Sequence, residues 1–184
     1  MKGRSSGSGT RSPDLSSSIQ WILFHAGERT LALELSAVRE IVPLPTIAPI
    51  PKAPQPLVGA IHLRGWIVPV LCTRTLLGFP PIPPHSAMRI VALEHGGHLM
   101  GLLVDEVITV GRSPLSVGGT QDGAIPEPPP LPFVAGSVEL EAVPGRPVWL
   151  IDPDRLLEHI AQWVHGPLTG PHVHPAATSV GDRP

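Results

Sequence analysis

The sequence is poor in charged and aromatic residues. Of its 184 residues, 15% are charged, 4% are aromatic, and none is a tyrosine. The 13 Lys and Arg nearly balance the 15 Asp and Glu, so the formal net charge is −2. Nucleic acids and anionic membranes are bound through clustered positive charge, and this balance gives no reason to expect either partner. The core has to be built from Val, Leu, Ile and Ala, since 42% of residues are hydrophobic.

Cysteine and long apolar segments are also scarce. Cys72 is the single cysteine, which excludes an internal disulfide and favours the cytosol. Because its neighbours are apolar and offer no base, we interpret Cys72 as a small core residue rather than a nucleophile. No apolar run approaches the roughly 20 residues that span a bilayer, and Met1–Thr10 lacks the apolar stretch of a secretory signal. We expect a soluble, cytoplasmic protein.

The ends of the chain have little to bury. Residues 1–18 are rich in Ser, and residues 165–184 are rich in Pro, Gly and His, so both are predicted to be disordered tails. The folded unit is expected over residues 19–164. Its largest loop is expected at Gly111–Pro132, which is proline-rich and is either a binding element or a plain surface excursion.

Short apolar runs separated by turn residues predict β-strands. Ile19–Phe24 and Thr30–Leu35 flank a glycine-containing turn, as do Arg89–Leu93 and Leu99–Val104, so each pair is predicted to form a hairpin. Trp66–Cys72 has the composition of a buried strand.

The remaining segments of the first half are less regular. Ser36–Ile41 fits a single helical turn, and the prolines of Val42–Pro56 exclude a helix and restrict any strand to a sheet edge. Leu57–Leu63 is ambiguous. Thr73–Leu77, followed by Gly78, predicts a brief helical turn with a glycine stop.

The second half of the chain repeats the order of the first. One overlay aligns Gly27 with Gly96 and Val38 with Val107, and a second aligns Val68 with Val148; between them, Gly59 falls on Gly136. Duplication predicts two similar small barrels or sheets packed together, with subdomains at about 19–85 and 86–164 and a connection near Phe79–Ser86. A chance overlay of two β-rich halves is the alternative.

One longer helix is predicted near the end of the folded unit. Asp152 is placed to cap it, and Pro153 suits the first helical position. Leu156, Leu157 and Ile160 then form an apolar stripe at helical spacing.

No recognised catalytic motif is present. The chain has no phosphate-binding loop, no Gly-x-Ser-x-Gly elbow and no His-Glu-x-x-His pair. Two groups of histidines are candidates for metal binding. The pair His95 and His98 lacks a third ligand at a diagnostic spacing, and the tail group His165, His172 and His174 lacks a scaffold that would fix its geometry. We therefore expect no catalytic residue, metal or cofactor, although catalytic groups distant in sequence are not excluded. Asp105-Glu106 adjoins a strand end, where a turn or capping role is ordinary.

Arg64-Gly65 interrupts the apolar segment Leu57–Leu71. Gly65 permits a tight turn, which presents Arg64 between Leu63 and Trp66. A solvated turn arginine is the ordinary interpretation. An arginine ringed by apolar side chains is also typical of a protein-binding hot spot.

Four stretches, in the same order, resemble the CheW family. Gly59–Val70, ending in Leu76-Leu77-Gly78, resembles its most specific signature; Leu33–Ile41, Gly101–Val107 and Val148–Leu157 resemble the others. The resemblance implies an all-β fold of two SH3-like, five-stranded β-barrels around a shared core, with short helical turns and a C-terminal helix. It also implies a non-enzymatic adaptor, monomeric in isolation, that joins chemoreceptor signalling tips to the regulatory domain of a CheA-type histidine kinase.

The resemblance also implies site residues. Val38, Glu40, Arg64 and Gly65 match the receptor-facing groove, and no residue is assigned to kinase binding. The chain departs from the family at His62, where Asn is usual, and at Cys72-Thr73, where Asp-Leu is usual. The second change removes a polar anchor that the Asp152 position keeps, so a member that binds receptor and has lost kinase binding is one expectation.

Two other functions stay open at this point. One is a free-standing β-barrel module that binds Pro-rich or other peptides outside chemotaxis. The other is a metal-dependent enzyme.

Overall fold

The computed structural model describes residues 19–95, 97–112, 131–139 and 143–164. The expected tails and most of the expected loop at Gly111–Pro132 lie outside the described residues. The candidate metal ligands His165, His172 and His174 lie outside them as well.

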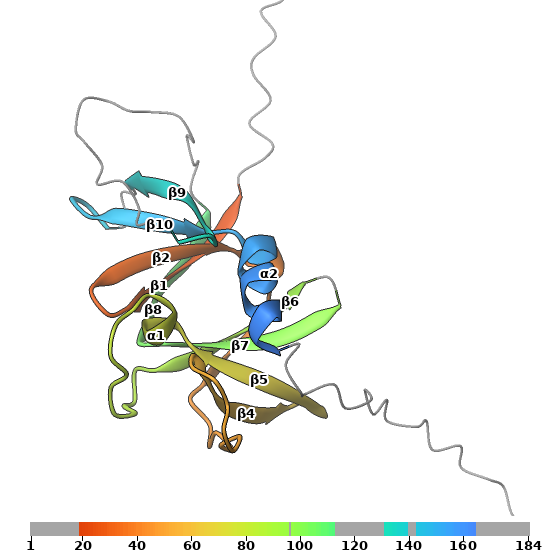
Figure 1. Ribbon diagram of the computed structural model, residues 1–184. Coiled ribbons are helices and arrows are strands. Elements are labelled where there is room, and N and C mark those ends of the chain that lie inside the picture. The colour runs from red at the N-terminus through yellow and green to blue at the C-terminus, as the bar shows by residue number, and fades with distance from the viewer. Residues whose placement is uncertain (1–18, 96, 113–130, 140–142, 165–184) are drawn as a thin grey trace, which may run out of the picture.

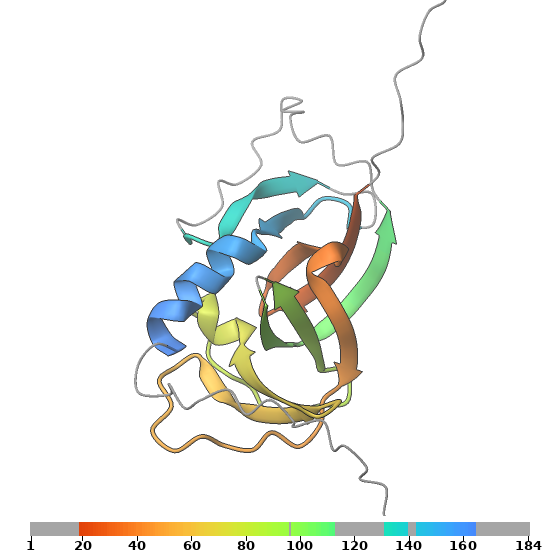
Figure 2. The same ribbon diagram turned by 90° about the vertical axis from the view of Figure 1, so that its right-hand side faces the viewer.

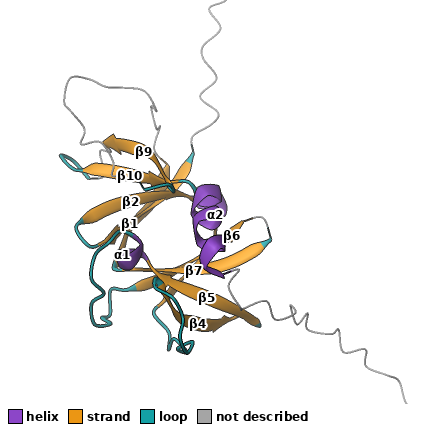
Figure 3. Cartoon of the chain, in the orientation of Figure 1, coloured by secondary structure: helices purple, strands orange, loops and turns teal. Residues whose placement is uncertain are grey.

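Strands dominate the described part of the chain (Figure 3). The strands are β1 (Gln20–Ala26), β2 (Arg29–Glu34), β3 (Val38–Pro43), β4 (Leu57–Leu63), β5 (Trp66–Cys72), β6 (Arg89–His95), β7 (His98–Val104), β8 (Glu106–Arg112), β9 (Val134–Glu139) and β10 (Pro147–Ile151). The helices are the 3-10 turn η1 (Leu35–Ala37), α1 (Thr73–Leu76) and α2 (Pro153–Val164).

The predicted hairpins are confirmed. β1 pairs with β2, and β6 pairs with β7, both antiparallel. The prediction of a helical turn over Ser36–Ile41 is wrong beyond its first residues, because only Leu35–Ala37 is helical and β3 begins at Val38. The β-branched side chains of β3 favour a strand, and β3 gains a partner in β6 that the local sequence does not reveal.

The strands form two five-stranded sheets that exchange strands between the halves of the chain. Sheet A has the order β8-β1-β2-β10-β9, and sheet B has the order β3-β6-β7-β5-β4. Figure 1 shows sheet A above sheet B. The sheets do not divide at the expected subdomain boundary near residue 85, because β3, β4 and β5 precede it and still complete the sheet that contains β6 and β7.

The predicted repeat is visible in this topology. One sheet order becomes the other when each strand is replaced by the strand five places away in the chain. The equivalent pairs are β1 and β6, β2 and β7, β3 and β8, β4 and β9, and β5 and β10. The parallel contact of β10 with β2 has its counterpart in the parallel contact of β5 with β7.

Each sheet is buried on both faces. The largest cluster lies between the sheets and contains Ile22 and Phe24 of β1, Val91 and Leu93 of β6, and Leu156 of α2. On β1, the alternate residues Trp21 and Leu23 belong instead to a cluster within sheet A, and a third cluster lies within sheet B. Burying a large apolar side chain contributes about 1.5–3 kcal/mol, so the shared cluster is a major source of stability.

Figures 1 and 2 show helix α2 lying beside the two sheets, and its Leu156 and Ile160 belong to the shared cluster. Its predicted cap is confirmed, since the backbone N–H of Arg155 donates to Oδ1 of Asp152 at 3.1 Å. Leu156 and Ile160 are buried. None of the described helices is long and apolar enough to cross a membrane.

Asp105, between β7 and β8, ties the two sheets together. Its Oδ2 accepts from the backbone N–H of Gly27, in the turn of sheet A, and from Nη1 of Arg74 in α1, both at 2.7 Å. Its own N–H donates to the carbonyl of His25 at 2.9 Å. Gly27 has a φ of +64°, and a Cβ there would lie 2.6 Å from the ring of Phe79. Asp105 has the turn role expected for it, and it also joins the β1–β2 turn of sheet A to α1, which follows β5 of sheet B.

Removing the Asp105 carboxylate is expected to destabilise the fold. The side chains of Arg74 and Asp105 are only 16% and 14% exposed, so Asp105→Ala leaves Nη1 of Arg74 and the backbone N–H of Gly27 without their acceptor. We expect a loss of about 2–3 kcal/mol in the free energy of unfolding, measured with urea. The control is Glu94→Ala, which breaks the more exposed Arg39–Glu94 pair and is expected to cost less than about 1 kcal/mol. Equal losses would contradict the role given to Asp105.

Candidate docking site

The edge strands of sheet B bring two of the expected site residues into contact. Glu40 lies on β3, and Arg64 lies in the turn between β4 and β5. Nε of Arg64 donates to Oε1 of Glu40 at 2.8 Å. β3 and β4 are the two edges of the sheet, so this bond spans the gap between them.

A second link joins the same two edges. After β3 the chain runs alongside β4, where Ala48 and Ala60 exchange two backbone hydrogen bonds of 2.8 Å. A Cβ on Gly59 would lie 2.3 Å from the carbonyl oxygen of Ala48, so glycine is required for this approach. The two links turn sheet B into a closed barrel.

The Arg64-Gly65 turn has an unusual backbone. Leu63 pairs with Trp66, which leaves Arg64 and Gly65 as a two-residue loop with φ values of +48° and +88°. Positive φ at both positions is typical of a type I′ hairpin turn, where Asn-Gly is favoured. Gly65 adopts this conformation without strain, whereas arginine does so at a cost. Residues held in a strained backbone conformation are often found at functional sites.

Arg64 presents its charge to solvent. Its side chain is 72% exposed, while that of Glu40 is 18% exposed. The hydrogen bond that Arg64 donates to Glu40, together with the coulombic attraction of that carboxylate, raises the pKa of Arg64 above its ordinary value. Since exposed ion pairs add little stability, the pair orients charge rather than holding the fold together.

Val38 is placed differently from the other expected residues. It packs against the shared cluster between the sheets. The pairing of β3 with β6 shifts register between Val38 and Glu40, and Val42 beyond Glu40 packs against the cluster within sheet B. The structure therefore gathers Glu40, Arg64 and Gly65, with Val38 as a support from the core.

Two exposed apolar residues follow the turn. Trp66 is 47% exposed and Ile67 is 80% exposed, so the prediction that all of Trp66–Cys72 is buried is wrong at its first two residues. Trp66 lies opposite Leu63, which packs against the cluster within sheet B; Ile67 lies opposite His62 on the other face. Proximity to a hairpin turn was the available signal, since strand ends extend beyond the core. We call Glu40, Arg64, Gly65 and Trp66 the hairpin site.

The departures at His62 and Cys72-Thr73 have different consequences. His62 is exposed on β4. Cys72 is buried, as predicted, but it makes no side-chain cap to α1, and Oγ1 of Thr73 is buried without a hydrogen-bond partner. At the corresponding end of β10, Asp152 does cap α2. The end of β5 therefore lacks the capping side chain that Asp152 provides at the end of β10.

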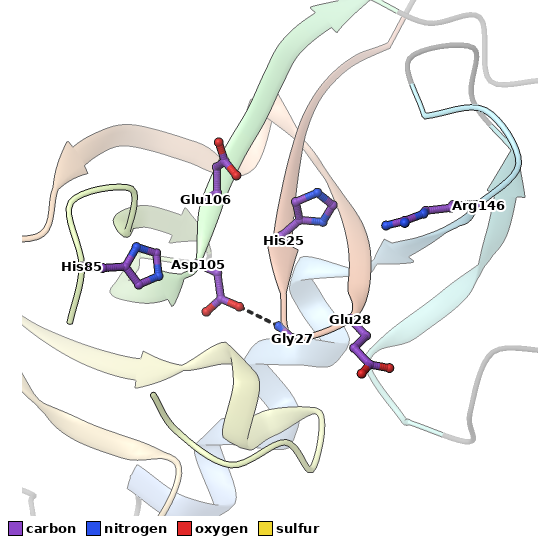
Figure 4. A pocket seen from close by; sticks show the side chains of 7 residues that line it. All are labelled: His25, Gly27, Glu28, His85, Asp105, Glu106 and Arg146. Atoms are coloured by element: carbon purple, nitrogen blue, oxygen red, sulfur yellow. Dashed lines mark hydrogen bonds between the residues drawn. The ribbon is translucent and has the colours of Figure 1, made fainter. Parts of the chain in front are cut away.

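A separate shallow hollow of about 280 Å³ opens between the β1–β2 turn, the connection that contains His85, and two loops of the second half. Figure 4 shows the residues that line it: His25, Gly27, Glu28, His85, Asp105, Glu106 and Arg146. The sequence had suggested none of them as a group, because they come from four distant segments. Among the described residues, no three His, Cys, Asp or Glu side chains are placed to hold a metal ion.

Comparison with known proteins gives a consistent result. The chain matches the CheW-like domain over residues 20–161. It is 27% identical to chemotaxis protein CheW of Rhizobium meliloti (strain 1021) over 142 residues, which cover 72% of this chain and 83% of that protein. It is 26% identical to chemotaxis protein CheW of Thermotoga maritima over 140 residues, which cover 74% of this chain and 86% of that protein.

A solved structure shares the fold. The scaffolding protein TtCheW from Thermoanaerobacter tengcongensis superposes with a TM-score of 0.61 at 25% sequence identity. The match covers 78% of this chain and 90% of that one.

Replacing Arg64 by asparagine is expected to separate the cost of its strained backbone from the stability that its bond to Glu40 contributes. Arg64→Asn places a residue that tolerates positive φ in the turn, so the urea midpoint is expected to rise. Lys52→Asn is the matched control, since Lys52 has a φ of +60° and lies outside the hairpin site. A fall in the midpoint for Arg64→Asn alone would show that the bond to Glu40 outweighs the strain.

Proposed function

This chain belongs to the CheW-like domain family, and we propose that it is a non-enzymatic adaptor that couples chemoreceptor signalling tips to a CheA-type histidine kinase. Two observations support the proposal. Two relatives that align over most of the chain are named chemotaxis protein CheW, and a solved structure with the same fold is named a scaffolding protein.

The hairpin site is the proposed receptor-docking surface. A receptor tip is helical, and an amphipathic helix docks through an apolar stripe bordered by charge. Trp66 offers a half-exposed apolar surface directly after the turn, while the Glu40 bond holds Arg64 in one orientation. An aromatic residue beside an arginine is the composition typical of a binding hot spot. The Arg64–Glu40 pair beside Trp66 is the observation that carries the proposal.

The kinase regulatory domain is the proposed second partner. Its contact lies elsewhere on the molecule, so that receptor and kinase can be held at the same time. The missing cap at Cys72 leaves the start of α1 less firmly fixed than the start of α2. Weakened kinase binding with full receptor binding is the expected result if that end of β5 contributes to the kinase contact.

Arg64→Ala is expected to weaken receptor docking without changing the thermal melt. A charge and its oriented guanidinium are lost from the surface. The carboxylate of Glu40, 18% exposed, loses its partner but stays in contact with solvent, so the cost in stability is expected to be below about 1 kcal/mol. Titration calorimetry with a helical signalling fragment of a chemoreceptor is expected to show a loss of roughly 30-fold, the size typical of a hot-spot residue. Unchanged affinity, or a melting temperature several degrees lower with binding intact, would show that Arg64 is structural.

Arg39→Ala is the matched control. Arg39 is adjacent to Glu40, but its ion pair is with Glu94; the affinity for the receptor fragment is expected to stay within about threefold. In the same series, the kinase regulatory domain is expected to bind Arg64→Ala and the parent chain equally. A chain that binds neither fragment, and instead binds members of a Pro-rich peptide library, would replace the adaptor by a peptide-binding module.

A further inference from the structure

The internal repeat gives the hairpin site a counterpart in sheet A. The turn between β4 and β5 corresponds to the segment between β9 and β10, and Gly65 corresponds to Gly145, which also has a positive φ, at +71°. Arg64 precedes the first glycine, and Arg146 follows the second. On β8 the position that corresponds to Glu40 is Thr109, which has no carboxylate. The second turn has an arginine, and the repeat gives it no acid.

Arg146 has no partner among the residues that the structure describes. Its side chain is exposed and lines the hollow between the repeats. It has no hydrogen bond, ion pair or ring contact, and it is the one arginine of which this is true among those whose side chains the structure describes. The partners of the others are Trp149 for Arg29, Glu94 for Arg39, Glu40 for Arg64, Asp105 for Arg74, the carbonyls of Ser86 and Met88 for Arg89, and Asp152 for Arg155.

His25 provides a second polar group on the same side of the hollow. Figure 4 shows the guanidinium of Arg146 pointing toward the imidazole of His25, while the carboxylate of Glu28 points away from both. Nδ1 of His25 lies 3.3 Å from the hydroxyl of Thr30, a buried residue. When that hydroxyl donates to Nδ1, the proton of the neutral ring is on Nε2, which is then free to donate to a ligand.

The acids that line the hollow do not neutralise Arg146. Asp105 is occupied by Gly27 and Arg74. Glu28 and Glu106 make no ion pair with Arg146 in the described structure. Their negative charge disfavours tight binding of a free anion, so a suitable ligand is an acidic side chain that a protein presents and whose affinity comes partly from other contacts.

We infer that this hollow is a second docking site, in which Arg146 and His25 bind the carboxylate of an acidic side chain of a protein partner. Arginine suits this ligand because its guanidinium donates two parallel hydrogen bonds to a carboxylate. In the first repeat, the acid that pairs with the arginine is Glu40 of the same chain. In the second repeat, the protein partner supplies the acid that pairs with Arg146. The inference rests on the proposed function in one respect: a coupling protein needs two docking surfaces, and the repeat supplies them on opposite sheets.

Nuclear magnetic resonance of the full chain tests the site directly. The probe is the peptide acetyl-Ala-Glu-Ala-amide, and acetyl-Ala-Gln-Ala-amide is its uncharged match. We expect the Nε–H signal of Arg146 and the ring signals of His25 to shift with the Glu peptide in a saturable manner. The shifts of His25 are expected to need roughly tenfold more peptide, or to vanish, in Arg146→Gln. Equal shifts with the Gln peptide, or unchanged shifts of His25 in Arg146→Gln, overturn the inference.

Arg155 is the internal control, since it is also exposed and has its own acid in Asp152. Its Nε–H signal is expected to stay still; a shift as large as that of Arg146 would mean general attraction to surface arginines and would overturn the site. Arg146→Gln is expected to bind the receptor fragment normally, and Arg64→Ala is expected to keep the peptide response. If the parent chain does not bind the receptor fragment but still shows the peptide response, the result counts against the proposed function and leaves the second docking site standing.

Discussion

Neither half of the chain can complete a sheet without the other. β3, β4 and β5 leave the β1–β2 hairpin of their own half and join β6 and β7, while β8, β9 and β10 join β1 and β2. The apolar cluster between the sheets draws on both, and α2 covers it. This exchange makes the two sheets one cooperative unit, and Asp105 reinforces it by joining the β1–β2 turn to α1. Such a frame suits the proposed adaptor function, because motion between two docking surfaces would uncouple the partners that they hold.

The exchange also determines where the docking groups lie. Glu40 is on the edge strand β3, and Arg64 is in the turn that follows the other edge strand, β4. They meet because the backbone bonds between Ala48 and Ala60 bring these two edges together. Arg64 stays in a backbone conformation that suits asparagine or glycine better. Strain at this turn is compatible with stability because the clusters on both faces of the sheet fix its strands. The repeat then places Arg146 in the corresponding turn of the other sheet, where Thr109 replaces the acid.

Sequence patterns predicted the local elements well and their assembly only in part. The hairpins, the Asp152 cap and the duplication follow from turn residues and spacing, because these signals are local. The membership of β3 in sheet B does not, since its pairing with β6 depends on the whole topology. The exposure of Trp66 and Ile67 was missed for a similar reason: composition does not show where a strand extends past the core. Of the site residues, Arg64 and Gly65 were recognisable from their apolar surroundings, whereas Arg146, His25 and Asp105 come together only in the fold.

Native-state hydrogen exchange tests the central claim, that the exchanged strands make one cooperative unit. The buried amides of β1 and β2 in sheet A and of β6 and β7 in sheet B are followed together at increasing urea. We expect the slowest amides of both sheets to share one free energy of opening and one dependence on urea, because opening either sheet removes strands from both halves. A sheet whose amides exchange through a separate opening, with a lower free energy and a weaker dependence on urea, would contradict the account.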